Sequence, residues 1–157
     1  MALEMVWHVV LNAAQSYGAA GGLIDITLDE SSGCVQVRDF STGVPAPDIT
    51  ALGEHAAKNQ IGIPFVLAMA DYFCFNSIYD GGRKWMMRTV AQGARNPGIV
   101  DSICDGFGGT LVTFRPKPEF LAGGVLNTQS ISQVTDGVRR EWPKTVYRVI
   151  VSRGNQR

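Results

Sequence analysis

The chain has 157 residues, of which 45% are hydrophobic and 18% are charged, and its formal net charge at pH 7 is zero. This length and balance predict one soluble globular domain with a single core. The charges are scattered, which argues against a dedicated nucleic-acid binder. No apolar run approaches the ~18 residues of a membrane span and no signal peptide opens the chain, so we expect no membrane partner and a cytoplasmic location.

The cysteines Cys34, Cys74 and Cys104 are odd in number and widely spaced. Cys34 and Cys74 fall in apolar, strand-like runs, which predicts reduced, buried thiols. Spacing typical of a metal site, such as CxxC, is absent from the sequence. We therefore expect neither a metal nor a cofactor.

The first forty residues predict a helix followed by a hairpin. Apolar residues recur at helical spacing over 3–17, and Gly18 ends this stripe. Residues 23–28 alternate as a strand, and a turn of two serines and a glycine leads to a second strand over 34–39. A loop rich in glycine and proline follows over 41–47.

The rest of the chain predicts alternating helices and strands. Helices are expected over 50–58, 63–70 and 130–142, and strands over 72–79, 84–91, 110–115 and 146–152, with a tight turn at 80–82. This order predicts an α/β (α+β) fold, a two-layer sandwich whose mixed, mainly antiparallel sheet is covered by helices on one face.

Several segments together resemble the GHKL, or Bergerat-fold, ATPases. They are Met5–Gln15 of the first helix, Val37–Pro45 with its Asp39 and its Gly-Val-Pro ending, Ile61–Ala70, and Gly108-Gly109-Thr110. The resemblance covers roughly residues 3–120 and is greatest to the N-terminal ATP-binding domain of the DNA gyrase B protein. It implies a single GHKL-like domain over 1–157 that lacks most of the ATP lid and any transducer domain.

The resemblance also implies a set of ligand-binding residues. Asn12 stands at the position of the family's magnesium-binding asparagine, and Asp39 at that of the aspartate that accepts a hydrogen bond from the adenine amino group. Thr110 matches a threonine beside the adenine. Phe40, Val44, Pro45 and Ile63 are expected to line the same pocket.

Other positions depart from the family pattern. His8 stands where these ATPases carry the glutamate that activates water, and Phe40-Ser41-Thr42 replaces an Asp-Gly-Arg. Only about 16 residues separate Pro45 from Gly62, roughly half the length of the family's lid. Glycine-rich amides and a helix N-terminus cradle a triphosphate in such a lid. ATP hydrolysis is therefore not expected.

Glu4 and His8 are four residues apart, on one face of the first predicted helix. A carboxylate can orient an imidazole and raise its basicity, so this pair is the candidate acid–base dyad, with His8 and Glu4 as catalytic residues. The alternative is that Glu4 is a surface residue and His8 a packed pocket histidine.

The sequence leaves several functions open. One is an enzyme acting on an organic small molecule by acid–base-assisted isomerisation, cyclisation, dehydration or addition in specialised metabolism. Another is a non-catalytic pseudo-ATPase or binding module for a nucleotide or a gyrase-directed drug. A residual gyrase-like ATPase is the third.

Overall fold

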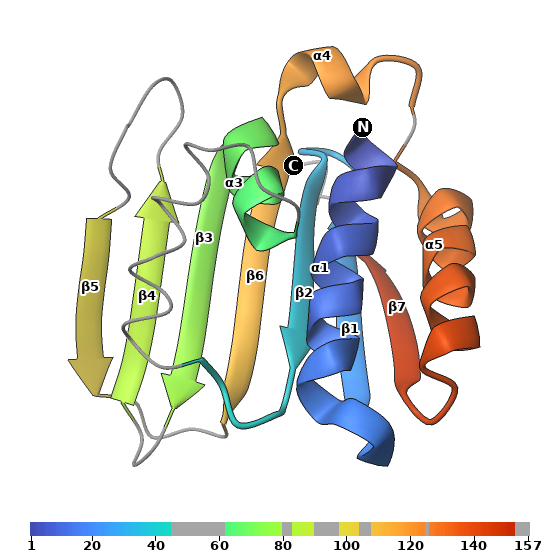
Figure 1. Ribbon diagram of the computed structural model, residues 1–157. Coiled ribbons are helices and arrows are strands. Elements are labelled where there is room, and N and C mark those ends of the chain that lie inside the picture. Colours follow the sequence, from blue (N-terminus) through green and yellow to red (C-terminus); the bar gives the residue numbers. More distant parts are fainter. Residues whose placement is uncertain (45–61, 80–82, 90–97, 104–107, 125, 153–157) are drawn as a thin grey trace.

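The computed structural model describes residues 1–44, 62–79, 83–89, 98–103, 108–124 and 126–152 (Figure 1). The strands are β1 (Leu23–Asp29), β2 (Cys34–Asp39), β3 (Ala70–Tyr79), β4 (Arg83–Thr89), β5 (Gly98–Ile103), β6 (Gly109–Pro116) and β7 (Val146–Ser152). The helices are α1 (Ala2–Tyr17), the 3-10 turn η1 (Gly18–Ala20), α3 (Ile63–Met69), α4 (Pro118–Leu121) and α5 (Thr128–Glu141).

The strands form one seven-stranded sheet in the order β5-β4-β3-β6-β2-β1-β7. The pair β1–β7 is parallel and every other neighbouring pair is antiparallel. Helices α1, α3 and α5 lie on one face of the sheet (Figure 1). These findings confirm the predicted mixed α/β architecture, with a mainly antiparallel sheet and helices on one side.

Helix α1 is the central element of the helical layer. Its buried side chains include Val6, Val9, Val10 and Ala13, which recur at the spacing that keeps one face of a helix against a core. The helix ends at Gly18, whose φ is 58°. Glycine adopts such a positive φ without strain because it has no Cβ. The predicted helix over 3–17 is thus confirmed to within one residue.

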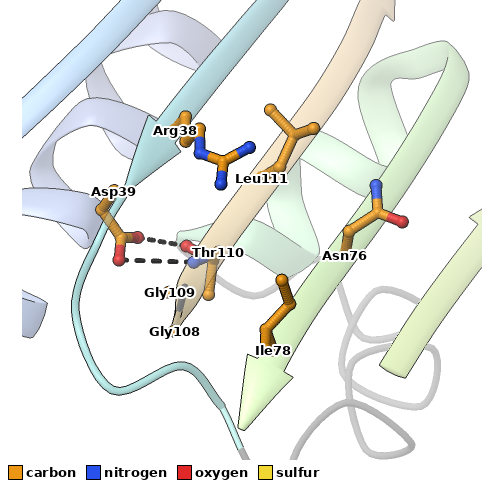
Figure 2. Close-up of a pocket in the computed structure, with 8 residues that line it drawn as sticks. All are labelled: Arg38, Asp39, Asn76, Ile78, Gly108, Gly109, Thr110 and Leu111. Atoms are coloured by element: carbon orange, nitrogen blue, oxygen red, sulfur yellow. Dashed lines mark hydrogen bonds between the residues drawn. The ribbon is translucent and has the colours of Figure 1, made fainter. Parts of the chain in front are cut away.

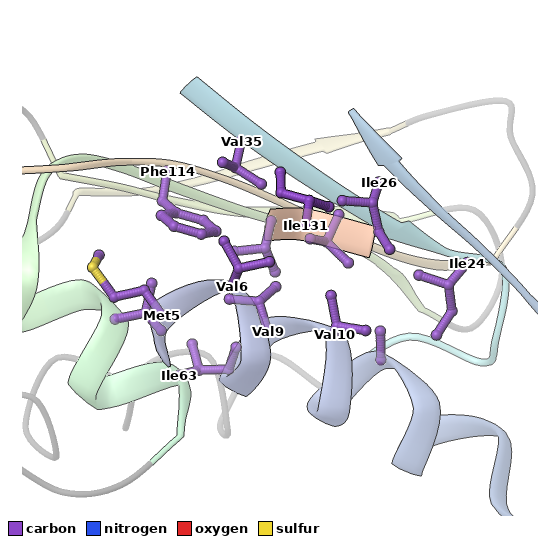
Figure 3. Packing of buried hydrophobic residues seen from close by; sticks show 14 of the residues in the cluster. Met5, Val6, Val9, Val10, Ile24, Ile26, Val35, Ile63, Phe114 and Ile131 are labelled. Atoms are coloured by element: carbon purple, nitrogen blue, oxygen red, sulfur yellow. The ribbon is translucent and has the colours of Figure 1, made fainter. Parts of the chain in front are cut away.

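The core lies between α1, α3, α5 and the covered face of the sheet (Figure 3). Alternate residues of each strand point into it, as the pleat of a strand requires. The strands contribute mainly branched aliphatic and phenylalanine side chains: Ile24, Ile26, Leu28, Val35, Val37, Phe73, Phe75, Val112 and Phe114. The intervening residues of the same strands lie on the opposite face, here called the helix-free face.

The β1–β2 hairpin is held by its turn. The Asp29 carboxylate accepts hydrogen bonds from the backbone and side chain of Ser31 and from the hydroxyl of Ser32. These bonds favour the ionised carboxylate and lower the pKa of Asp29 to about 2. The register pairs Asp29 with Cys34, so the predicted hairpin is confirmed.

Helix α5 begins two residues before the predicted start at 130. Asn127 accepts a hydrogen bond from the Ser130 amide while the Ser130 hydroxyl accepts one from the Asn127 amide, and this capping box fixes the N-terminus. The edge strand β5 and the single turn α4 were not predicted, because each is too short to show a clear period. The helix predicted over 50–58 and the turn at 80–82 lie outside the described residues.

Two further sequence predictions concern the thiols and membranes. Cys34 and Cys74 are free thiols, as expected, and Cys74 is buried. Cys34, predicted to be buried, is half-buried at the start of β2, next to the exposed turn residues Ser31 and Ser32, while Cys104 lies outside the described residues. Among the described helices, none combines the length and apolar character needed to cross a membrane.

Candidate functional site

The Asp39 carboxylate is the centre of the candidate site. Asp39 ends β2 and is only 1% exposed, on the covered face that Val35 and Val37 also occupy. The hydroxyl of Thr110 donates a hydrogen bond to it, as does the Thr110 amide at 3.3 Å. The amide and hydroxyl of Ser41 donate as well. Burying a carboxylate is costly without such partners, so these donors stabilise its charge in place.

Close backbone approach at the ends of β2 and β6 brings Asp39 and Thr110 together. Gly109 has a φ of 120°, and a Cβ added there would lie 2.2 Å from the carbonyl oxygen of Asp39. A side chain at this position would force the strands apart. Gly109 therefore sets the spacing that allows the adjacent Thr110 to reach the Asp39 carboxylate.

Tyr17 links the end of α1 to the same region. Its hydroxyl donates to the carbonyl of Leu23 at 2.6 Å and accepts from the amide of Phe40 at 2.6 Å. Burial is the main cause that raises the pKa of Tyr17 above its ordinary value. The protonated phenol is the form that makes both bonds, so this tyrosine anchors α1 to the ends of β1 and β2.

A small cavity of about 50 Å³ adjoins Asp39 and Thr110 (Figure 2). Its other lining residues are Arg38 from β2, Asn76 and Ile78 from β3, and residues 108, 109 and 111. Figure 2 shows Arg38, Leu111 and Asn76 side by side on neighbouring strands, with the Asp39–Thr110 contact next to them. Of the predicted ligand-binding residues, Asp39 and Thr110 border this cavity.

The proposed dyad lies apart from that cavity. His8 is half-buried, and its ring packs edge-on against Trp7 at 5.1 Å and Phe65 at 5.3 Å between ring centroids. Burial lowers the pKa of His8, while the charge of Glu4 partly raises it. Glu4 is exposed, and no hydrogen bond joins these two described residues. The pair interacts through charge rather than through a bond.

The other predicted ligand-binding residues are dispersed. Asn12 is exposed, whereas Ile63 is 4% exposed and belongs to the core. Val44 is half-buried, with its amide and carbonyl bound to the Ser77 hydroxyl. Phe40 is 37% exposed and lies beneath the Arg38 guanidinium. Pro45 lies outside the described residues.

Sequence reasoning missed Arg38, Asn76, Ile78 and Leu111. Strand alternation could have placed Arg38 on the opposite face from Asp39, but not beside Asn76. That juxtaposition depends on the strand order β3-β6-β2, in which β6 pairs with both partners. The sequence carries no signal for this order.

Two other features of the described residues bear on the site. A second cavity, of about 270 Å³, lies at the end of α1 and is lined by Gly18, Ala19 and residues 141–145. It contains none of the predicted site residues. No group of three or more histidine, cysteine, aspartate or glutamate residues suited to a metal occurs in the described part of the chain.

Comparisons with protein-family models and with curated proteins give no match to this chain.

Proposed function

We propose that this chain binds an organic small molecule in a pocket related to the ATP site of GHKL ATPases, with Asp39 and Thr110 as the recognition pair. The observation that carries the proposal is the contact between these two residues, 71 positions apart in the sequence, which holds a buried carboxylate at the end of β2. In the family that the sequence resembles, an aspartate and a threonine at these positions lie beside the adenine. A ligand N–H could take the place of the Ser41 hydroxyl on the carboxylate.

ATP hydrolysis is not part of the proposal. His8 stands where the family has its water-activating glutamate, and its ring is packed against Trp7 and Phe65. The residue at the water-activating position is therefore part of an aromatic cluster.

Acid–base help from His8 is a second function that one observation favours. Because burial lowers its pKa, the His8 imidazole is mainly neutral near pH 7 and can accept a proton. Isomerisation, cyclisation, dehydration or addition each includes a proton transfer that such an imidazole can accept as a base and then return as an acid. A non-catalytic module that binds a nucleotide or a gyrase-directed drug through Asp39 is the alternative that does not use His8.

Calorimetry tests the recognition pair. ADP, ATP and an aminocoumarin are titrated into the wild-type chain, Asp39→Asn and the control Asp136→Asn. The control removes one carboxylate charge from an exposed position on α5. We expect binding of at least one probe to weaken about tenfold or more in Asp39→Asn and to stay unchanged in the control, because a charged hydrogen-bond acceptor is lost. If none of the probes binds the folded wild-type chain, the proposed relation to the GHKL site fails.

Turnover assays test the residual ATPase activity and the role of His8. Magnesium-dependent ATP hydrolysis that disappears in Asn12→Ala would favour the residual ATPase instead. Once a substrate is known, unchanged turnover in folded His8→Ala would remove His8 from the mechanism.

A further inference from the structure

Arginines on the helix-free face of the sheet differ in how their charges are compensated. Arg115 on β6 donates through Nε to both carboxylate oxygens of Asp71, at 2.8 and 3.0 Å. Arg148 on β7 donates to both oxygens of Asp25, at 2.8 and 2.6 Å. Each of these guanidinium groups has a carboxylate of its own.

Arg38 on β2 lies on the same face, and the described part of the chain offers it no such partner. Among the described residues, no carboxylate lies within ion-pair distance of it. Its guanidinium carbon lies 4.8 Å from the centroid of the Phe40 ring. A cation over the face of an aromatic ring is attracted by it. The Arg38 side chain is half-buried and lines the small cavity. The fold thus holds a positive charge at an opening, with no carboxylate partner among the described residues.

Asn76 supplies a second donor across the cavity. In the register of the sheet, Arg38 and Asn76 both pair with Leu111 of β6, so they flank it in one row. Neighbouring strands lie about 4.8 Å apart, which puts the two Cα atoms about 10 Å from each other. The Asn76 amide donates one hydrogen to the Cys74 sulfur at 3.3 Å. Its second amide hydrogen has no acceptor among the described residues.

Two residues further along the strands, the sheet leaves an open space beside these donors. Ile78 pairs with Gly109, which has no side chain to fill the gap between β2 and β3. The resulting cavity has a volume of about 50 Å³, and Leu111 and Ile78 form apolar walls. A space of this size matches a group of a few heavy atoms, such as a carboxylate or a phosphate.

We infer that this cavity binds the oxyanion of a small molecule, with the Arg38 guanidinium as the charged donor and the Asn76 amide as the second donor. Guanidinium–oxyanion pairs are among the strongest hydrogen bonds in proteins, and the planar fork suits two oxygens at once. Asp39 also borders the cavity, but its carboxylate is on the covered side, where Thr110 and Ser41 already donate to it. The inference goes beyond the proposed function and stands whether or not Asp39 holds a ligand.

NMR titration tests the inference. Sodium acetate and inorganic phosphate are added separately to the ¹⁵N-labelled chain, with sodium chloride keeping the ionic strength constant. We expect saturable shifts of the Gly109 amide, the Asn76 side-chain amide and the Arg38 Nε–H for at least one anion. Saturation by acetate alone identifies a carboxylate ligand, and saturation by phosphate alone a phosphorylated one.

Matched variants assign the binding to Arg38. Arg38→Gln is expected to weaken the saturating anion at least about tenfold, and Arg38→Lys, which keeps the charge but loses the fork, by less. Arg148→Gln removes the same charge from the same face and should change the affinity less than twofold. Shifts that stay linear with both anions in the wild-type chain would overturn the inference. So would equal weakening by Arg38→Gln and Arg148→Gln in variants that keep the wild-type amide spectrum.

Discussion

The two faces of the sheet are built from the same strands but are stabilised differently. On the covered face, side chains such as Ile26, Val37 and Phe114 are fully or almost fully buried beneath the helices. On the helix-free face, the pairs Asp25–Arg148 and Asp71–Arg115 bridge neighbouring strands. One face therefore removes apolar surface from water, whereas the other carries partly exposed ion pairs that each contribute little.

Among the residues whose side chains the structure describes, two charged residues that are adjacent in the sequence depart from this contrast. Asp39 is a charged residue on the apolar face, and Arg38 is an arginine without a described carboxylate partner on the face of ion pairs. Both lie at the end of β2, next to the same cavity. The end of β2 therefore combines a buried carboxylate on the covered face with an arginine that has no described carboxylate partner on the helix-free face.

The largest expected loss of stability comes from truncating a buried side chain on the covered face. Phe114 is fully buried, whereas Ile150 on the helix-free face is 41% exposed. Phe114→Ala should lower the free energy of unfolding by about 3–5 kcal/mol, because it removes a whole ring from the core. Ile150→Ala should cost less than about 1 kcal/mol. Urea denaturation measures both. Similar losses in the two variants would show that the helix-free face is buried in solution by something else.

Loss of the Thr110 hydroxyl comes next. Thr110→Val keeps the shape but takes one donor from the buried Asp39 carboxylate. It should cost about 1–3 kcal/mol. Thr113→Val is the control, because it makes the same change on the opposite face of β6, where no hydrogen bond of the Thr113 hydroxyl is found within the described part of the chain. We expect the control to stay within about 0.5 kcal/mol of the wild-type stability. Equal losses would mean that Asp39 does not depend on Thr110.

The contrast between the faces also explains how far the sequence predicts this molecule. Periodicity is a local property, so α1 and the β1–β2 hairpin could be located from the pattern of apolar residues alone. The spatial neighbours of Arg38 could not, because they depend on β6 lying between β2 and β3. When a site is formed by strands that are distant in the sequence, the residue pattern of any one strand does not predict it.

The Asp39–Thr110 contact lies between these two cases, because local periodicity did not predict it but the family resemblance did. The resemblance of the sequence to the GHKL ATPases predicted that both residues lie beside one ligand, and the structure shows them in contact. For Glu4 and His8, helical spacing correctly placed the residues within range of each other's charge. It did not predict that the exposed Glu4 would make no bond to the His8 imidazole, or that Phe65 of α3 would pack against the ring.

The ion pairs of the helix-free face should have smaller effects. Arg148 is largely exposed in its pair with Asp25. Exposed pairs contribute about 0–1 kcal/mol, so Asp25→Asn should lower the stability by no more than that. The loss should shrink further in about 1 M sodium chloride, where the screening length is about 3 Å. Thermal and urea unfolding at low and high salt measure it. A loss that does not respond to salt would point to packing rather than charge.

The smallest expected effect is electrostatic and concerns His8. Its pKa in the folded chain is below the ordinary value of 6.5, so the folded state favours the neutral ring. The stability that this ring contributes is therefore complete above that ordinary value and is lost as the pH falls through the folded pKa. Glu4 attracts the imidazolium, so Glu4→Gln should lower the pKa of His8 further, whereas Glu141→Gln on α5 should leave it unchanged.

An NMR titration of the His8 ring in a His55→Gln background measures that shift, and its salt dependence distinguishes two kinds of dyad. A carboxylate that acts only through charge loses its influence as salt is added, because Glu4 is exposed. A carboxylate that hydrogen-bonds the imidazole keeps its influence, because the bond is short and excludes ions. The described geometry predicts the first result. If the effect of Glu4→Gln persists in high salt, Glu4 positions the His8 ring directly, and the case for acid–base chemistry at His8 becomes stronger.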